Sequence, residues 1–283
     1  MKIDNLTTNV LENLRCPVSL DKLQILDDDL YSATGYKYPE GDFRVISSLT
    51  QSLEWSKGQF HYEKYHSKTI AQSDRYYTDV DAETKEIYED IKLSGMVLDV
   101  GGGFGSVAKQ ARLDPEQIIC VDPMICRWQD LPDSPYKRHY EHLSKIVRIP
   151  GFAEDLPFSN TSVDTVHMRS CLDHFANPHR ALLEARRVLN ADGTLVIGLA
   201  LEGAFKLKQT GGIRDKAKKI VKHSFVGDIY EHFFDQHIFH PTEDSLRTLI
   251  DSAGFKIHQW IMQPGYFNVV YVVARKYNPL IPA

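Results

Sequence analysis

The sequence predicts an α/β fold: a doubly wound, mostly parallel sheet of seven strands with a C-terminal antiparallel hairpin, plus a small β-rich N-terminal module. Two observations support this prediction. From residue 81 onward, helical patterns alternate with short apolar runs, which is typical of strands joined by crossover helices. Near the C-terminus, two long strand patterns are separated by a turn too short for a parallel crossover, so these strands must pair antiparallel.

The first part of the chain divides into two segments. Residues 1–50 are short runs interrupted by acidic, glycine and proline turn signals, and they predict a small β-rich module. Residues 51–80 are rich in aromatic residues and histidines, and they predict a connector or lid. Within it, Tyr62, Tyr65 and His66 are expected either over a bound cofactor or at a domain interface.

A larger domain is predicted over residues 81–283. A helix near residues 81–93 opens it, and a second helix starts at about residue 104. Residues 178–189 carry the apolar stripe of a third helix. The strands expected in the parallel part of the sheet are 96–100, 117–121, 145–149, 162–168 and 193–199.

The C-terminal third departs from simple alternation. An insertion at about residues 201–240 precedes a helix that has Thr242 as its N-cap and stops at Gly254. Two strand patterns then follow, at residues 255–262 and 266–276, and these form the predicted hairpin.

The composition is that of an ordinary globular protein. The 283 residues are 42% hydrophobic and 25% charged, which argues against disorder and coiled coil. A net charge of −5 gives no global attraction for nucleic acid or an anionic membrane. Four widely spaced cysteines and a start without a leader pattern predict a reduced, cytoplasmic protein. No apolar run approaches the roughly 20 residues of a membrane span.

Residues 97–105, VLDVGGGFG, are an apolar strand that runs into a glycine loop and then into a helix. Such a loop lets the backbone approach a ligand, and the helix presents free N–H groups. Asp122 ends the next strand, where a carboxylate can accept both hydroxyls of a ribose. Ser106 replaces the third glycine of a dinucleotide fingerprint, and Asp99 suits an ammonium group better than a pyrophosphate. The pattern therefore favours S-adenosylmethionine over NAD.

Four sequence blocks, in the right order, carry a family resemblance. They are VLDVGGGFG, ICVDP, GFAEDLPFSNTSVDTVHM and HRALLEARRVLNADGTLVIG. With them, about residues 81–276 resemble class I S-adenosylmethionine-dependent methyltransferases, in the broad group of the ubiquinone and menaquinone methyltransferases. The resemblance implies S-adenosylmethionine as cofactor and says little about the methyl acceptor.

The resemblance also implies a set of cofactor-binding residues. Asp99 matches the acid that helps to hold the amino group of the cofactor, and Asp122 matches the ribose-binding acid. Gly101 and Gly103 match the glycines beneath the amino-acid and ribose parts. Phe152 stands where the family often has an aspartate for the adenine amino group, so one of the next three residues would replace it. The remaining residues implied, on the adenine and methionine sides, are Pro123, Met124, Ala153, Glu154, Asp155, Arg169 and Ser170.

Residues 14–49 resemble a small zinc-ribbon module that occurs as the activator subunit of several translation-related methyltransferases. That module has two pairs of cysteines, whereas here Cys16 remains, Ser19 replaces its partner, and Ser32 and the residues before Gly35 supply no thiolate. A structural zinc site needs four good ligands. We therefore expect the fold of the module without its metal, and no metal site elsewhere.

Residues 169–175, RSCLDHF, follow the fourth strand and supply candidates for the acceptor site. Ligands of doubly wound folds lie outside the carboxyl ends of the strands. Asp173 and His174 are therefore candidates for orienting or deprotonating the acceptor, the alternative being that they brace the next helix. Cys171 is expected to be a packing residue rather than a nucleophile.

Two further features bear on the acceptor. His232, His237 and His240 are expected to line an acceptor pocket or to pack structurally, because their spacing matches no metal motif. The basic run 206–223 is either a solvated helix face or a surface for a phosphorylated, nucleic-acid or lipid-linked acceptor.

The function expected is transfer of a methyl group to an O or N atom of a small molecule or of a sugar or lipid precursor. RNA methylation is the first alternative, and a non-catalytic cofactor-binding or activator protein is the second. The sequence makes no prediction of oligomeric state.

Overall fold

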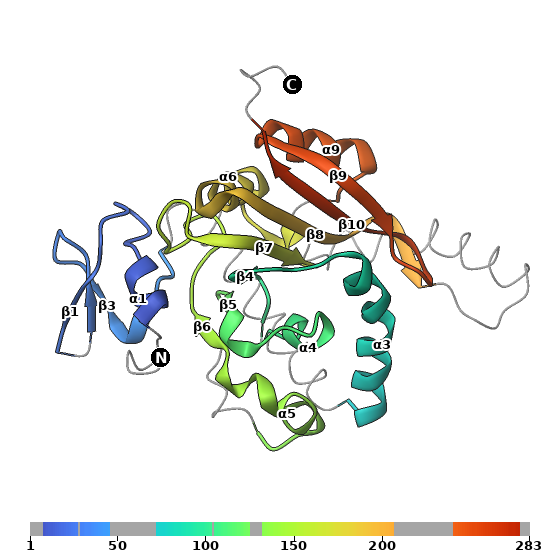
Figure 1. Ribbon diagram of the computed structural model, residues 1–283, viewed down its shortest axis with the longest axis horizontal. Helices are drawn as coiled ribbons and strands as arrows, with labels where there is room; N and C mark the ends of the chain where they lie inside the picture. Colours follow the sequence, from blue (N-terminus) through green and yellow to red (C-terminus); the bar gives the residue numbers. More distant parts are fainter. Residues whose placement is uncertain are drawn as a thin grey trace, which may run out of the picture.

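A computed structural model describes residues 8–27, 29–45, 72–103, 105–124, 132–206 and 240–277. The main sheet lies at the centre of three layers (Figure 1). Helices α6 (Pro178–Val188) and α9 (Glu243–Ser252) cover one face, and α3 (Asp74–Asp90), α4 (Val107–Gln110) and α5 (Pro135–His139) cover the other. This is the predicted doubly wound α/β fold.

The sheet has seven strands in the order β6-β5-β4-β7-β8-β10-β9. β4 pairs in parallel with β5 and β7, so the chain moves outward first to one side of β4 and then to the other. Ligands of open α/β sheets bind at this kind of switch point, outside the carboxyl ends of the strands. The strands are β4 (Val97–Val100), β5 (Ile118–Val121), β6 (Val147–Ile149), β7 (Val163–Arg169), β8 (Leu189–Lys206), β9 (Phe255–Met262) and β10 (Tyr266–Lys276).

Burial on both faces explains the apolar runs of the central strands. All four residues of β4 and all four of β5 are buried, as parallel strands covered by helices on both sides require. β10 inserts between β8 and β9 and is antiparallel to both, which confirms the predicted C-terminal hairpin.

The predicted helix near the C-terminus is confirmed with its capping residue. Thr242 accepts from the N–H of Ser245 and the Ser245 side chain accepts from the N–H of Thr242, so that a capping box fixes the start of α9. Gly254 follows the helix at φ +78°.

Two helices differ from the expectation. α3 starts at Asp74 rather than near residue 81, because the Ser73 hydroxyl caps it by accepting from the N–H of Tyr76. α4 has only four residues, after which the chain turns at Arg112 with φ +55°. Most of the expected connector, with Tyr62, Tyr65 and His66, lies outside the described residues, and so do residues 207–239 of the expected insertion.

The N-terminal part forms helix α1 (Thr8–Asn13) and a small antiparallel sheet of β1 (Gln24–Leu26), β2 (Asp29–Tyr31) and β3 (Lys37–Tyr38). These elements lie at one side of the main sheet (Figure 1). The predicted β-rich module is thus present as a three-stranded sheet with an added helix.

The small sheet shares its hydrophobic core with the larger domain. Phe43 is fully buried, its N–H donates to the carbonyl of Pro150 at 2.8 Å, and it forms a parallel bridge with Gly151. Leu14 pairs antiparallel with Phe158, and both side chains are in the main core cluster. The N-terminal part therefore holds residues 150–158, which precede β7, through these contacts.

Candidate functional site

The glycine loop is a tight turn anchored on the neighbouring strand. Gly101, at φ +68°, donates its N–H to the carbonyl of Val121 at 2.8 Å, which joins the ends of β4 and β5. Gly103 has φ +56°, and nothing described lies within 4 Å of where a Cβ would be. A residue other than glycine would be strained there and would project into the open space beside the loop.

Asp122 lies against this loop. Its Oδ2 accepts the N–H of Gly103 at 2.9 Å, and its Oδ1 accepts the N–H of Met124 at 2.7 Å. Each carboxylate oxygen has two lone pairs, so both keep the capacity to accept a further hydroxyl. The carboxylate is therefore fixed in place and able to bind a vicinal diol such as that of a ribose.

The protonation of Asp122 gives a testable pH dependence. Burial raises the pKa of Asp122, against the opposing effect of the N–H groups of Met124 and Gly103. Ribose hydroxyls donate to the charged form, so nucleoside binding is complete above the pKa of the free protein and is lost as pH falls through it. We expect the affinity for S-adenosylhomocysteine, measured by calorimetry, to begin to fall at a higher pH than it would if Asp122 had the pKa of an ordinary aspartate. An affinity independent of pH down to pH 4 would contradict this assignment.

The carboxylate of Asp99 is buried and does not face solvent. It is only 2% exposed, and its Oδ1 lies 2.7 Å from Nδ1 of His167, which in turn lies 2.9 Å from the hydroxyl of Tyr88 through its Nε2. A Cβ at Gly102 would fall 1.9 Å from Oδ2 of Asp99. The carboxylate therefore lies directly beneath the glycine turn. His167 and Tyr88 are site residues that the sequence analysis missed.

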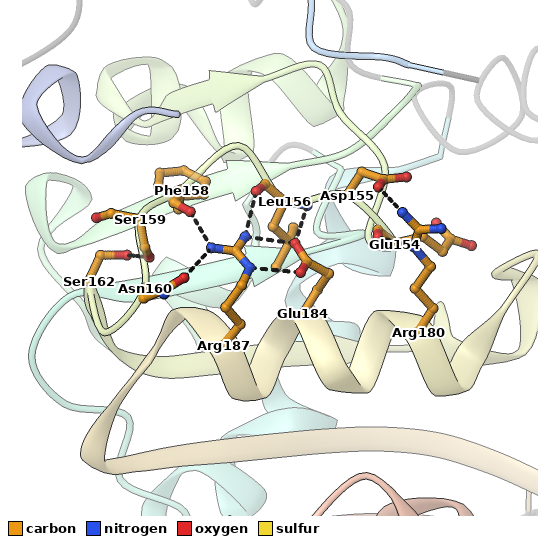
Figure 2. Close-up of polar contacts among 10 residues, drawn as sticks. All are labelled: Glu154, Asp155, Leu156, Phe158, Ser159, Asn160, Ser162, Arg180, Glu184 and Arg187. Carbon is orange, nitrogen blue, oxygen red and sulfur yellow. Dashed lines mark hydrogen bonds and ion pairs between the residues drawn. The ribbon is translucent and has the colours of Figure 1, made fainter. Parts of the chain in front are cut away.

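The residues expected on the adenine side lie in a buried loop between β6 and β7. Arg187 of α6 donates to the carbonyls of Phe158 at 2.6 Å and Leu156 at 2.9 Å, and it pairs with Glu184 (Figure 2). Glu184 also accepts the N–H of Leu156 at 2.9 Å. One helical face thereby fixes the loop that carries Ala153, which is itself buried.

Glu154 and Asp155 both face the start of α6. Glu154 accepts the N–H of Asn177 through Oε1 at 3.1 Å, and Asp155 forms an ion pair with Arg180 through Oδ1 (Figure 2). Burial raises the pKa of Asp155, and the charge of Arg180 opposes that effect. The Oδ2 of Asp155 is buried and accepts no hydrogen bond from the described residues. This oxygen is therefore an acceptor within the loop whose hydrogen-bonding capacity the described residues do not use.

Pro123 and Met124 follow Asp122 and are half-buried. The N-terminal part reaches this edge of the site, because Nη1 of Arg44 lies 3.4 Å from the carbonyl of Pro123 while Arg44 pairs with Asp42. The sequence analysis gave Arg44 no role, and a contact between residues so far apart in the chain has no local signal.

On the other side of the loop, the segment that follows β7 carries Ser170, expected at the methionine part, and the expected acceptor residues Asp173 and His174. Ser170 has φ +51° and is exposed, and its N–H donates to the carbonyl of Gly198 at 2.7 Å. In the short helix η6 (Leu172–His174), Asp173 is 7% exposed whereas His174 is exposed. Of the two, His174 is therefore the group open to an acceptor.

The side chains of Cys171 and Arg169 both make hydrogen bonds within the protein. The Sγ of Cys171 donates to the carbonyl of Val100 at 3.2 Å, and burial raises the pKa of this thiol well above its ordinary value. A buried thiol of this kind is inert, in line with the expected packing role. The Arg169 side chain donates to Oε1 of Gln110 at 2.6 Å, so it points toward α4. The backbone of Arg169 is at the end of β7.

The serines that replace the expected cysteines of the N-terminal module make hydrogen bonds. The Sγ of Cys16 accepts the N–H of Ser19 at 3.3 Å and lies 3.0 Å from the hydroxyl of Tyr38. Ser32 accepts the N–H of Tyr36 at 2.9 Å. Within the described residues, no group of three or more His, Cys, Asp or Glu side chains could hold a metal ion. His240 is described and exposed, while His232 and His237 lie outside the described residues.

We expect the purified protein to contain no stoichiometric zinc, and a chelator to leave its Tm unchanged, because one cysteine cannot build a tetrahedral site. Elemental analysis checks this directly. One zinc per chain would show that ligands outside the N-terminal module complete a site.

Comparison with known proteins agrees with the geometry. A family model for a methyltransferase domain matches residues 98–197. The 2-methyl-6-phytyl-1,4-hydroquinone methyltransferase 2, chloroplastic, of Oryza sativa subsp. japonica is 32% identical over 103 residues, which cover 34% of this chain and 27% of that protein. The ubiquinone/menaquinone biosynthesis C-methyltransferase UbiE of Vibrio cholerae is 27% identical over 186 residues, covering 61% of this chain and 66% of that protein. The chain thus spans less than two thirds of either relative.

Two solved structures share the fold. The 1,6-didemethyltoxoflavin-N1-methyltransferase of Burkholderia thailandensis, solved with 1,6-didemethyltoxoflavin and S-adenosylhomocysteine, has a TM-score of 0.52 at 15% identity and covers 90% of this chain and 98% of its own. A chain in the complex of the Haloferax volcanii Trm112 methyltransferase activator with a methyltransferase has a TM-score of 0.53 at 14% identity and covers 78% and 97%.

The sheet order and the glycine loop, together with these matches, define a methyltransferase domain. In the matched residues and in its fold, the chain resembles class I S-adenosylmethionine-dependent methyltransferases. None of the helices in the described part of the chain combines the length and the hydrophobicity that a membrane span needs.

Proposed function

We propose that the protein transfers the methyl group of S-adenosylmethionine to a small molecule. The observation that carries the proposal is the carboxylate of Asp122, which two backbone N–H groups fix beside the open side of Gly103. This arrangement suits a ribose, and the buried Oδ2 of Asp155 would accept from the adenine amino group. S-adenosylmethionine supplies both groups without a pyrophosphate, which the nearby carboxylates would repel.

The residues of the chain would hold the cofactor in three parts. Asp122 binds the ribose, the loop around Ala153 and Asp155 holds the adenine, and the turn at Gly101 together with Ser170 borders the methionine part. When bound, the cofactor supplies a methyl group activated on a sulfonium sulfur. The chain then has to place the acceptor atom in line with the methyl carbon and the sulfur. Holding two reactants in line can contribute roughly 7–11 kcal/mol.

His174 is the group that we propose removes a proton from the acceptor. It is the last residue of η6, which follows β7, it is exposed, and it stands two residues beyond the buried Leu172. An acceptor hydroxyl has to lose its proton for oxygen to attack the methyl carbon. Asp173, which is buried, would orient η6 rather than contact the acceptor.

The chemistry of a base at this position supports the acceptor class, and the names of the relatives supply a second candidate atom. We propose a small molecule methylated at O or N, with a hydroxyl or amine that a base activates. The matched relatives are by name a hydroquinone methyltransferase and quinone-biosynthesis C-methyltransferases. A phenol deprotonated by His174 carries negative charge on both oxygen and ring carbon, so a phenolic ring carbon is the second candidate atom. Apart from Lys206, the basic run that would favour RNA lies outside the described residues.

His174→Ala is expected to lower turnover with the true acceptor by at least about tenfold, because a general base contributes about 10²–10⁴-fold. S-adenosylmethionine affinity should stay within about twofold, since the group acts on the acceptor. Methyl incorporation from labelled cofactor into metabolite fractions, followed by calorimetry, measures both. His179→Ala, a half-buried histidine on α6, is the matched control. Equal losses of turnover and affinity would indicate a structural role for His174.

A further inference from the structure

A line of three buried polar side chains lies under the glycine loop and takes no part in the chemistry above. Tyr88 of α3, His167 of β7 and Asp99 of β4 are 7%, 1% and 2% exposed. The Tyr88 hydroxyl lies 2.9 Å from Nε2 of His167, and Nδ1 of His167 lies 2.7 Å from Oδ1 of Asp99. The parallel register of β4 and β7 sets Asp99 opposite His167.

The direction of the hydrogen bonds follows from which group can donate. Burial raises the pKa of Tyr88 well above its ordinary value, so the phenol keeps its proton and can donate it to Nε2 of His167. The imidazole then carries its proton on Nδ1 and donates to Asp99. Each of the three side chains thus has a hydrogen-bond partner within the line, and the guanidinium of Arg169 lies near Tyr88 and Asp99.

The surroundings keep that charge beneath the loop. The Sγ of Cys120 donates to Oδ2 of Asp99 at 3.6 Å, and a Cβ at Gly102 would lie 1.9 Å from the same oxygen. Arg169 of β7 and Tyr271 of β10 also face this region, and burial raises the pKa of Tyr271 so that it remains neutral. The glycine turn thus separates the carboxylate from the open side of the loop by the thickness of one backbone.

We propose that His167, backed by Tyr88, is a positioning residue that holds the charged carboxylate of Asp99 against the glycine turn and thereby selects a cofactor with an ammonium group. This inference rests on the proposed function. A negative charge at short range in a poorly hydrated site attracts an ammonium group strongly. Rotation of Asp99 away from the turn would weaken that attraction without touching the ribose site at Asp122.

The test compares two ligands that share their adenine and ribose. S-adenosylhomocysteine carries the amino-acid part with its ammonium group, and 5′-methylthioadenosine lacks it. His167→Leu removes the donor to Asp99, whereas His167→Asn keeps an N–H close to the position of Nδ1. We expect His167→Leu to weaken S-adenosylhomocysteine binding at least tenfold and 5′-methylthioadenosine binding less than twofold. His167→Asn should restore S-adenosylhomocysteine binding to within about threefold of the parent protein.

Equal weakening of both ligands, or no weakening of either, would overturn the inference. Tyr88→Phe removes only the hydroxyl and should weaken S-adenosylhomocysteine binding by about threefold or more while sparing 5′-methylthioadenosine. Unchanged binding of both ligands by this variant would overturn the inference even if His167→Leu does not fold. If the parent protein binds neither ligand, the proposed function itself fails, and the two failures are thereby distinguished.

Discussion

Asp122→Ala is expected to weaken the binding of S-adenosylhomocysteine by about 2–4 kcal/mol, or roughly 30-fold to 1000-fold, because hydrogen bonds from two ribose hydroxyls to a charged group are lost. The carboxylate also accepts from Gly103 and Met124, so its removal leaves two N–H groups of the site without their acceptor. Calorimetry measures the affinity. The free energy of unfolding, measured in parallel, shows whether the variant remains folded.

Asp133→Ala is the control for this variant. Asp133 has a side chain that is 85% exposed and pairs with Arg138 at the surface, so its removal should leave affinity unchanged. If Asp122→Ala bound S-adenosylhomocysteine as tightly as the parent protein, the ribose would have to bind elsewhere.

Phe43→Ala is expected to lower the free energy of unfolding by about 3–5 kcal/mol, the usual cost of truncating a fully buried phenylalanine. Phe43 packs on Tyr38, with ring centroids 4.9 Å apart, and lies against Gly151 at the start of the adenine-side loop. Because the core is shared, the larger domain should be destabilised together with the N-terminal sheet. Denaturant titration followed by tryptophan fluorescence and by circular dichroism measures the effect.

Tyr36→Ala is the matched control, since Tyr36 is an aromatic residue that directly precedes β3 and is 59% exposed. It should cost less than about 1 kcal/mol, as surface substitutions generally do. A Phe43→Ala protein whose larger domain unfolds at the parent denaturant concentration would show that the N-terminal sheet is an independent unit.

The main sheet could be predicted because its strands are buried on both faces and read as apolar runs in the sequence. The C-terminal hairpin could be predicted because its short turn excludes a crossover. The start of α3 was predicted too late, because Ser73 precedes a polar, aromatic stretch. The hydrogen bond from the N–H of Tyr76 to the Ser73 side chain, which caps the helix, becomes visible only in the structure. Strand β8 was also predicted too short, at residues 193–199. The strand begins directly after α6, at Leu189, and extends to Lys206.

Some residues of the candidate site could likewise be predicted from the sequence, and others could not. Gly101, Gly103 and Asp122 stand at fixed distances along one βαβ unit, so local spacing indicates them. His167 lies within an apolar strand pattern and resembles a core residue until the β4–β7 register sets it beside Asp99. Arg187 similarly lies on the polar side of a helix, and its carbonyl partners at Leu156 and Phe158 come from a loop far away in the chain. Such contacts depend on tertiary packing, which no local pattern encodes.

The central claim is that this chain binds S-adenosylmethionine through Asp122, and calorimetric titration of the parent protein with S-adenosylhomocysteine and with NAD tests it most directly. The account predicts binding of one S-adenosylhomocysteine per chain, loss of that binding in Asp122→Ala, and no competition by NAD. Binding of NAD at the same site, or unchanged S-adenosylhomocysteine binding in Asp122→Ala, would contradict it.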